Sequence, residues 1–418
     1  MGASLTAPTR RMRIRPMIRH ARASAGSSCP GRTSERGRGA RPRALPASAS
    51  SMRGMAAHRV AHRHPHPHRH VAAVVVAAVT IGAMGGCVSG PPYDQLLTGD
   101  EELLSIAREQ YTEARDRVAM AVIDGDEVRT AFVSADAGTR FGLGAATSGL
   151  TGLLLADAIE RGEVSVDDPV SAYLDLGDAP AAALTLRDLA THRAGLPQSP
   201  LGPGAYEAAA APGEEVLDRG GIDALLARVA SLDLVPELEY NPNDFDAALV
   251  GQALAAATGT RFADLLAERV LGPAGMEGAL VVESGDLLPD GLAQGHDRRG
   301  ERVAARGSGA YAPAVGVVVT IDDAVALARA VLDGPLAGSD ALQPVASTRW
   351  PQIDVGYFWE RITDAGGDEV VYVVGSAEGF TAAVLADPAA GRAAVLLSNA
   401  EEAWPWLRLR PILGLLAD

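Results

Sequence analysis

The order of apolar runs along this chain restricts its fold more than any other feature. Two short β-rich runs lie near residue 120, three lie near the C-terminus, and the sequence between the two groups is mainly helical. The five runs are Val118–Ile123, Val128–Val133, Val370–Val374, Thr381–Ala386 and Ala393–Leu397. We therefore predict an α+β fold, in which N- and C-terminal strands form one antiparallel β-sheet flanked by helices, plus a mainly helical lobe from Leu184 to Met276.

Three helices are predicted around these strands. Helical spacing covers Glu101 to Arg115, Ala145 to Arg161 with Gly162 as its stop, and an amphipathic stretch from about Trp404 to Leu416. A cleft between the sheet and the helical lobe is the default place for a binding site.

The charge distribution divides the chain at Cys87. The residues before Cys87 carry fifteen arginines against one acid, Glu35, whereas the remainder carries 22 arginines against 51 acids. An acidic body repels nucleic acid and anionic membrane surfaces, so neither is expected as its partner. Cys29 is the only other cysteine, so the body has no intramolecular disulfide to form.

The first 87 residues divide into a leader, 1–51, and a segment with the pattern of an export signal, 52–87. Residues 1–51 are rich in Arg, Ser, Pro and Gly, which is typical of a disordered segment. They are interpreted either as a leader or as the result of a wrongly assigned start, in which case translation begins at Met52 or Met55. A basic region, Arg53 to His70, is followed by the apolar run Val71 to Met84, and the histidines there are interpreted as solvated rather than metal-binding.

The signal ends in Met84-Gly85-Gly86-Cys87, which resembles a bacterial lipoprotein cleavage box. We expect Cys87 to be lipidated and to anchor the chain to the outer face of the cytoplasmic membrane, and the alternative is a plain signal peptide ending near a cysteine. The domain boundaries predicted from this are 1–51 for the leader, 52–87 for the signal peptide, 88–100 for a tether and 101–418 for one folded domain.

Several segments of the body resemble the serine β-lactamase-like family, which includes class C β-lactamases, DD-peptidases and related esterases. The matching segments are 141–144 (FGLG), 163–170 (EVSVDDPV), 184–197 (LTLRDLATHRAGLP), 271–276 (LGPAGM), 313–316 (PAVG), 379–380 (GF) and 387–388 (DP). The resemblance implies that family's fold and a cleft at which three catalytic motifs meet.

The first family motif, Ser-x-x-Lys at the start of a helix, supplies the nucleophile and the base that activates it. Its positions fall on Ala145 and Ser148 here, and the 418 residues include no lysine at all. A methyl group cannot form an acyl-enzyme, and an ordinary hydroxyl is no base near neutral pH.

The second motif, Tyr-x-Asn, falls either on Tyr240-Asn241-Pro242 or on Pro242-Asn243-Asp244, and neither register keeps both residues. Tyr240 lies at the cleft edge in one interpretation and simply packs its ring in the other. Asp244 is either a lone carboxylate in the cleft or, as we favour, the N-cap of the helix that follows.

The third motif, Lys or His, then Thr or Ser, then Gly, falls on Val373-Val374-Gly375, where only the glycine is kept. The resemblance therefore implies a cleft lined by Ala145, Ser148, Tyr240, Asn243, Gly375 and Ser376 without a catalytic residue. Backbone N–H groups of Ala145 and of the stretch Gly375 to Ser376 can still form a nest for a carbonyl or carboxylate.

Substitute catalytic groups are scarce. Ser148 lies one helical turn beyond the nucleophile position, and no base is evident beside it. The body has two histidines: His192, which belongs to a fold-supporting segment of the family, and His296, expected in a polar loop. No spaced set of His, Asp and Glu indicates a metal site, and no cofactor is expected.

The sequence thus favours an exported lipoprotein with a β-lactamase/DD-peptidase-like domain that is catalytically inactive and binds a cell-wall fragment, a small molecule or an envelope protein. Two alternatives stay open: an active serine hydrolase that uses non-standard residues, and an envelope scaffold. Polar residues gathered around Ala145 favour ligand binding, whereas a cleft closed by Val373 and Pro242 favours the scaffold.

Overall fold

The structure is a computed structural model, and it describes residues 96–197, 220–235, 240–283, 288–304, 307–363, 367, 369–402 and 405–416. Cys87, the signal peptide and most of the tether lie outside these residues. No helix in the described ranges has both the length and the apolar character that crossing a bilayer requires.

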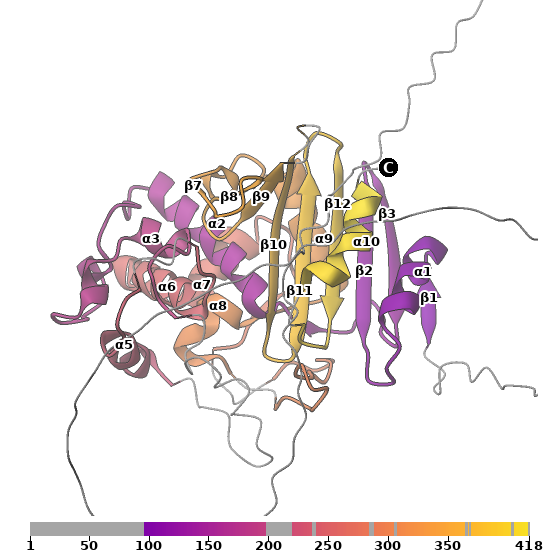
Figure 1. The fold of residues 1–418 in the computed structure, drawn as a ribbon, viewed down its shortest axis with the longest axis horizontal. Helices are drawn as coiled ribbons and strands as arrows, with labels where there is room; N and C mark the ends of the chain where they lie inside the picture. The colour runs from indigo at the N-terminus through magenta and orange to yellow at the C-terminus, as the bar shows by residue number, and fades with distance from the viewer. Residues whose placement is uncertain are drawn as a thin grey trace, which may run out of the picture. The chain divides into compact units, whose positions relative to one another are not determined.

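One antiparallel sheet joins strands from both ends of the sequence, in the order β1-β3-β2-β12-β11-β10-β9-β8-β7 (Figure 1). The strands are β1 (Leu97–Gly99), β2 (Val118–Asp124), β3 (Glu127–Val133), β7 (Ala346–Ser347), β8 (Ile353–Val355), β9 (Glu360–Thr363), β10 (Glu369–Ala377), β11 (Phe380–Asp387) and β12 (Arg392–Ser398). Strand β2 pairs with β12 from Val118 opposite Ser398 to Asp124 opposite Arg392. The predicted union of the two chain ends in one sheet is confirmed.

Both faces of this sheet are buried, which explains why its central strands are apolar throughout. On β12, Ala393, Val395 and Leu397 face the larger core, while Ala394 and Leu396 face a second core. Helix α9 (Ile321–Leu332) contacts the strands on the first face, and α1 (Glu101–Gln110) and α10 (Pro405–Leu416) belong to the second core (Figure 1).

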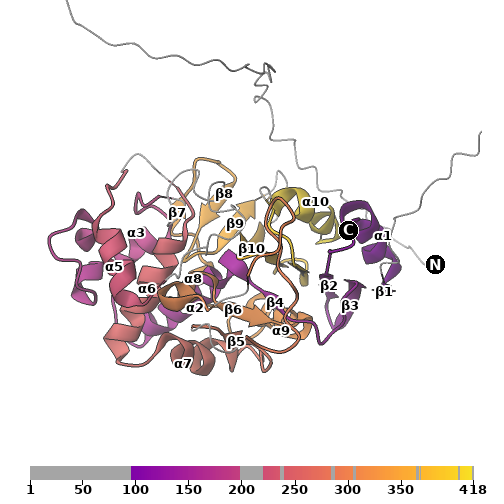
Figure 2. The same cartoon turned by 90° about the horizontal axis from the view of Figure 1, so that it is seen from below.

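The predicted helical lobe, Leu184 to Met276, contains α3 (Leu186–Ala190), α5 (Ile222–Ala230), α6 (Asp244–Thr258) and α7 (Phe262–Leu266). Two helices from outside that range, α2 (Thr147–Glu160) and α8 (Ala312–Val315), pack against α6. Figures 1 and 2 both place α3, α5 and α6 together and away from β1 to β3. A small second sheet, in the order β4-β6-β5, is made of β4 (Phe141–Gly142), β5 (Leu280–Val281) and β6 (Val317–Val319).

Two predicted element bounds need correction. Helix α1 ends at Gln110 rather than Arg115, because Tyr111 adopts an extended conformation and packs into the second core. The helix predicted from Ala145 begins as a 3-10 turn, Gly144–Ala146, and becomes α-helical at Thr147. Its predicted stop is confirmed, since Gly162 has a left-handed φ of 71°.

Candidate functional site

The N-terminal end of α2 holds the two residues at which the resemblance places nucleophile and base. Ala145 and Ser148 are both partly exposed there. The Ser148 hydroxyl donates a hydrogen bond to the carbonyl oxygen of Ala145, at 2.8 Å, and this is its only hydrogen-bond partner among the described residues. Its proton is thus held by the backbone of its own helix, and no carboxylate or imidazole in the described ranges accepts it.

Strand β10 passes directly beside this helix end. A Cβ atom placed on Gly375 would lie 2.0 Å from the Ala146 nitrogen and 2.7 Å from the Cα of Ala145. Both distances are far below van der Waals contact, so only glycine allows this approach. The structure therefore brings Gly375 and Ala145 together, as the alignment of the first and third motifs requires.

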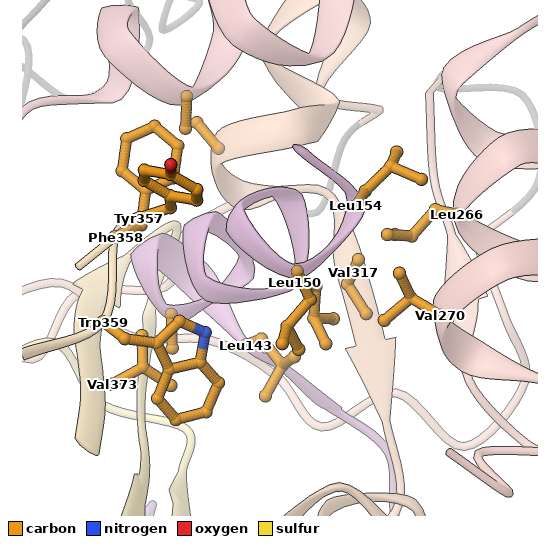
Figure 3. Packing of buried hydrophobic residues seen from close by; sticks show 14 of the residues in the cluster. Leu143, Leu150, Leu154, Leu266, Val270, Val317, Tyr357, Phe358, Trp359 and Val373 are labelled. Carbon is orange, nitrogen blue, oxygen red and sulfur yellow. The ribbon is translucent and has the colours of Figure 1, made fainter. Parts of the chain in front are cut away.

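Val373, at the cation position of the third motif, points into an apolar space beside α2. It is buried, and a Cβ atom on Gly149 would lie 3.0 Å from its Cγ2. Trp359 fills the same space, and its indole nitrogen donates a hydrogen bond of 2.9 Å to the Gly149 carbonyl oxygen. Figure 3 shows Trp359 and Val373 together on one side of α2, with Leu150 and Val317 on another. Val373 and Trp359 thus present apolar side chains to this side of α2.

The side chain of Ser376 faces away from Ala145. Its hydroxyl lies 2.9 Å from the Thr381 hydroxyl and accepts a hydrogen bond of 2.8 Å from the Glu402 backbone nitrogen. Successive side chains of a strand point to opposite faces of the sheet. Ser376 therefore points to the same face as Tyr372, which belongs to the second core. The prediction that Ser376 lines the cleft therefore holds at most for its backbone.

Tyr240 joins the helical lobe to strand β9. Its hydroxyl donates a hydrogen bond to Glu360, and its ring packs edge-on against His192 and Trp350, with centroids 6.0 and 6.5 Å away. Burial, and then the charge of Glu360, hold the pKa of Tyr240 well above its usual value. A tyrosine in this state keeps its proton, so it does not replace the missing base.

Glu360 is also contacted from β10. It pairs with Tyr372 in the register of β9 and β10, and the Tyr372 hydroxyl interacts with its carboxyl group. Burial raises the pKa of Glu360, whereas the two tyrosine hydroxyls and the nearby His192 lower it. The sequence analysis did not single out Glu360 or Tyr372.

The start of α6 forms a second polar cluster that the sequence analysis missed. Asn243 caps this helix, because its side-chain oxygen accepts a hydrogen bond of 3.0 Å from the Asp246 nitrogen. The interpretation of Asp244 as the N-cap was wrong by one residue, since Asp244 is the first residue of the helix. Pro242, just before the cap, is exposed and does not close the cleft.

Asp246 is fully buried, and its carboxylate oxygen Oδ2 lies 2.8 Å from Nδ1 of His192. Burial is the main cause that raises its pKa to about 6, and hydrogen bonds from His192 and Asn243 oppose the rise. His192 therefore ties the segment after α3 to the start of α6, in line with the fold-supporting role expected of it. The spacing of Asn243 and Asp246 was a usable sequence signal, because a cap residue and the third helical residue often bond to each other.

The second histidine also lies inside the structure. His296 lies in a loop, as predicted, but the residue is buried. Its backbone nitrogen donates to the carbonyl oxygens of Gly379 and Asn399, at 3.1 and 2.9 Å. Burial lowers its pKa. Within the described ranges, no group of three or more His, Cys, Asp or Glu side chains is placed to hold a metal ion.

Comparison with known proteins shows where this geometry belongs. A family model described as Beta-lactamase matches residues 106–415. Two similar solved structures are a class C beta-lactamase, with 15% sequence identity, a TM-score of 0.62 and coverage of 76% of this chain and 94% of that one, and a class C beta lactamase from Rhodobacter sphaeroides, with 20% identity, a TM-score of 0.60 and coverage of 76% and 97%.

A third similar structure is a D-stereospecific amidohydrolase from Streptomyces sp., with 17% identity, a TM-score of 0.62 and coverage of 74% of this chain and 97% of that one. A search of curated protein sequences finds no match. The structural likenesses establish the fold, and the family model covers most of the chain. The chain belongs to the Beta-lactamase family.

Proposed function

We propose that this chain is a non-hydrolytic member of its family that acts by binding a ligand or partner of the cell envelope at the cleft beside Ala145. The observation that carries the proposal is the state of the two motif residues. Ala145 has only a methyl group at the nucleophile position, and the Ser148 hydroxyl donates to the carbonyl oxygen of Ala145. Losing a nucleophile costs on the order of 10⁶ in turnover, so the remaining backbone groups support binding rather than bond cleavage.

A hydrolase that uses Ser148 or Thr147 has less support. The Thr147 side chain is fully buried, and its hydroxyl accepts a hydrogen bond from the Val317 nitrogen at 3.3 Å. Ser148 is accessible, but its proton is directed to a backbone carbonyl oxygen. Nucleophilic catalysis by serine or threonine requires a base hydrogen-bonded to the hydroxyl group. In the described ranges, neither the Ser148 nor the Thr147 hydroxyl has such a partner.

The scaffold alternative required the cleft to be closed by Val373 and Pro242. Val373 is buried against α2, but Pro242 is exposed, and Ala145 and Ser148 stay partly exposed. The end of α2 thus remains accessible, which argues against the scaffold alternative. The second expected sign of ligand binding, polar side chains gathered around Ala145, is not met by Val373 and Trp359, which are apolar.

The purified full chain is expected to hydrolyse neither nitrocefin nor p-nitrophenyl butyrate above the rate of its Ser148→Ala variant, because no described hydroxyl in the cleft is activated. The measurement is absorbance-monitored turnover at pH 7.5 for both proteins, with a matched Ser347→Ala variant, at an exposed strand position, as a control for purity. Turnover that disappears in Ser148→Ala and persists in Ser347→Ala contradicts the proposal.

We also propose that the chain is exported and held by a lipid on Cys87, on the outer face of the cytoplasmic membrane. The support is the sequence 84–87 (MGGC) after a basic and then an apolar stretch. In cells fed an alkyne-tagged fatty acid, the wild-type chain is expected to carry the tag and to sediment with membranes. The Cys87→Ser variant is expected to lose both properties, while Cys29→Ser keeps them. A tag that survives in Cys87→Ser refutes the anchor.

A further inference from the structure

A pocket lies between the small sheet β4-β6-β5 and the turn that joins β10 to β11. Its empty volume is about 430 Å³, part of which is open to solvent. An apolar cavity of about 150 Å³ holds a benzene molecule, so this pocket has room for one ring. Six apolar residues line it: Val282, Leu288, Leu292, Val315, Val318 and Phe380.

Part of the pocket wall is buried apolar surface that belongs to neither hydrophobic core. Val282 and Val318 are 9% and 7% exposed, and both are absent from the larger core and from the second core. Figure 3 shows Val317 beside Leu150 of α2. Successive side chains of a strand point to opposite faces, so Val318 points away from that core. The two valines therefore offer buried apolar surface to a molecule in the pocket.

One buried serine of the pocket wall has no hydrogen-bond partner for its side chain in the described part of the chain. Ser308 is 7% exposed and lines the pocket. Its backbone is satisfied, because its nitrogen donates to the Val282 carbonyl oxygen and its own carbonyl oxygen accepts from the Tyr311 nitrogen, at 3.0 and 2.9 Å. A buried hydroxyl group without a partner is unfavourable, and a ligand with one polar group relieves this.

The pocket lies beside the proposed cleft without sharing its motif residues. Gly144, which directly precedes Ala145, lines the pocket, whereas Ala145, Ser148 and Gly375 do not. A molecule in the pocket therefore needs none of the motif positions for its binding.

We propose that this pocket is a binding site for a small neutral phenol or alcohol of about the size of one ring. Burial of the ring against the apolar wall provides most of the binding energy. The ligand hydroxyl group forms a hydrogen bond with the Ser308 hydroxyl group. An anion is disfavoured, because apolar surroundings remove its hydration and because the acidic residue Glu378 also lines the pocket. This site goes beyond the proposed function and does not depend on it.

Fluorine NMR titration of the full chain at neutral pH tests the site with three ligands of similar size: para-fluorophenol, para-fluorotoluene and para-fluorobenzoate. Fluorophenol is expected to bind saturably, and fluorobenzoate is expected to bind roughly tenfold more weakly or worse, because its carboxylate loses hydration in the pocket. The absence of saturable fluorophenol binding, or fluorobenzoate binding that is as tight or tighter, overturns the proposal.

Ser308→Ala separates the hydrogen bond from the apolar contacts. The variant is expected to weaken fluorophenol binding roughly three- to tenfold and to leave fluorotoluene binding unchanged, because only fluorophenol has a hydroxyl group to pair with Ser308. Equal effects on the two ligands, including no effect on either, overturn the proposal.

Leu288→Ala tests the location of the ligands without disturbing the interior. Leu288 lines the pocket and is 39% exposed, so truncating it removes apolar surface where the pocket meets solvent. Fluorophenol and fluorotoluene are both expected to bind about threefold more weakly or worse. Leu96→Ala, the same change at a leucine that is 64% exposed and precedes β1, is the matched control and is expected to change neither affinity.

Affinities that are unchanged in Leu288→Ala, or equally weakened in Leu96→Ala, place the ligands elsewhere and overturn the proposal, even if Ser308→Ala fails to fold. These outcomes are separate from those of the hydrolysis assay. A failed titration refutes the pocket site alone, and turnover that depends on Ser148 refutes the non-hydrolytic function alone.

Discussion

Replacing Trp359 with alanine is expected to lower the free energy of unfolding by about 3–5 kcal/mol, the range for truncating a fully buried aromatic side chain. Trp359 is 1% exposed and fills the space between α2 and Val373 (Figure 3). The change leaves a cavity in the core beside α2 and removes the hydrogen bond to the Gly149 carbonyl oxygen. Urea unfolding followed by far-UV circular dichroism measures the effect.

Trp350→Ala is the matched control, because Trp350 is a partly exposed tryptophan. Its ring contacts Tyr240 edge-on and carries Arg349 above it, so its removal is expected to cost about 1 kcal/mol. Equal losses in the two variants contradict the packing described for Trp359.

Gly152→Ala is expected to be almost as damaging, at about 3 kcal/mol, although alanine is the better helix former. A Cβ atom at this position of α2 would lie 1.9 Å from the Tyr357 carbonyl oxygen. The segment that carries this oxygen cannot easily move away, because the Tyr357 nitrogen donates to Ala341 and the Phe358 nitrogen donates to Ala190, at 2.9 and 2.8 Å. Urea unfolding again gives the free-energy change.

Gly414→Ala supplies the comparison, because Gly414 lies in α10 and a Cβ atom there meets no other group within 4 Å. This variant is expected to be neutral or more stable by about 0.5–1 kcal/mol, from the conformational entropy that glycine loses in a helix. If Gly152→Ala behaves in the same way as Gly414→Ala, then α2 does not pack against the Tyr357 segment as described.

The sequence predicted the central sheet well because burial on both faces leaves continuous apolar runs. Strands β2, β11 and β12 consist of such runs, with glycine turns at Gly125 and Gly391 that adopt left-handed φ values of 55° and 68°. The sequence analysis did not predict β7, β8 and β9, because they have two to four residues each and carry polar side chains on a half-buried edge. Such short strands are stabilised by pairing and packing with neighbouring strands, and their own sequences show no strand periodicity.

The candidate site was predictable only where a motif position could be aligned. Ala145 and Gly375 could be paired in this way, and the structure places them in contact. The contacts of Glu360 could not be predicted, because they join residues far apart in the sequence. Tyr372 lies on the next strand, and Tyr240 is 120 residues away.

The proposed lack of an activated nucleophile in this chain is tested most directly by a search for a covalent adduct. The purified chain is incubated with a fluorescent penicillin and, separately, with a fluorophosphonate, and its intact mass is measured over several hours. We expect an unchanged mass in both cases, because Ala145 has no nucleophilic group and the Ser148 hydroxyl donates to the backbone. A mass increase of one probe that is located on Ser148 and lost in Ser148→Ala would contradict it.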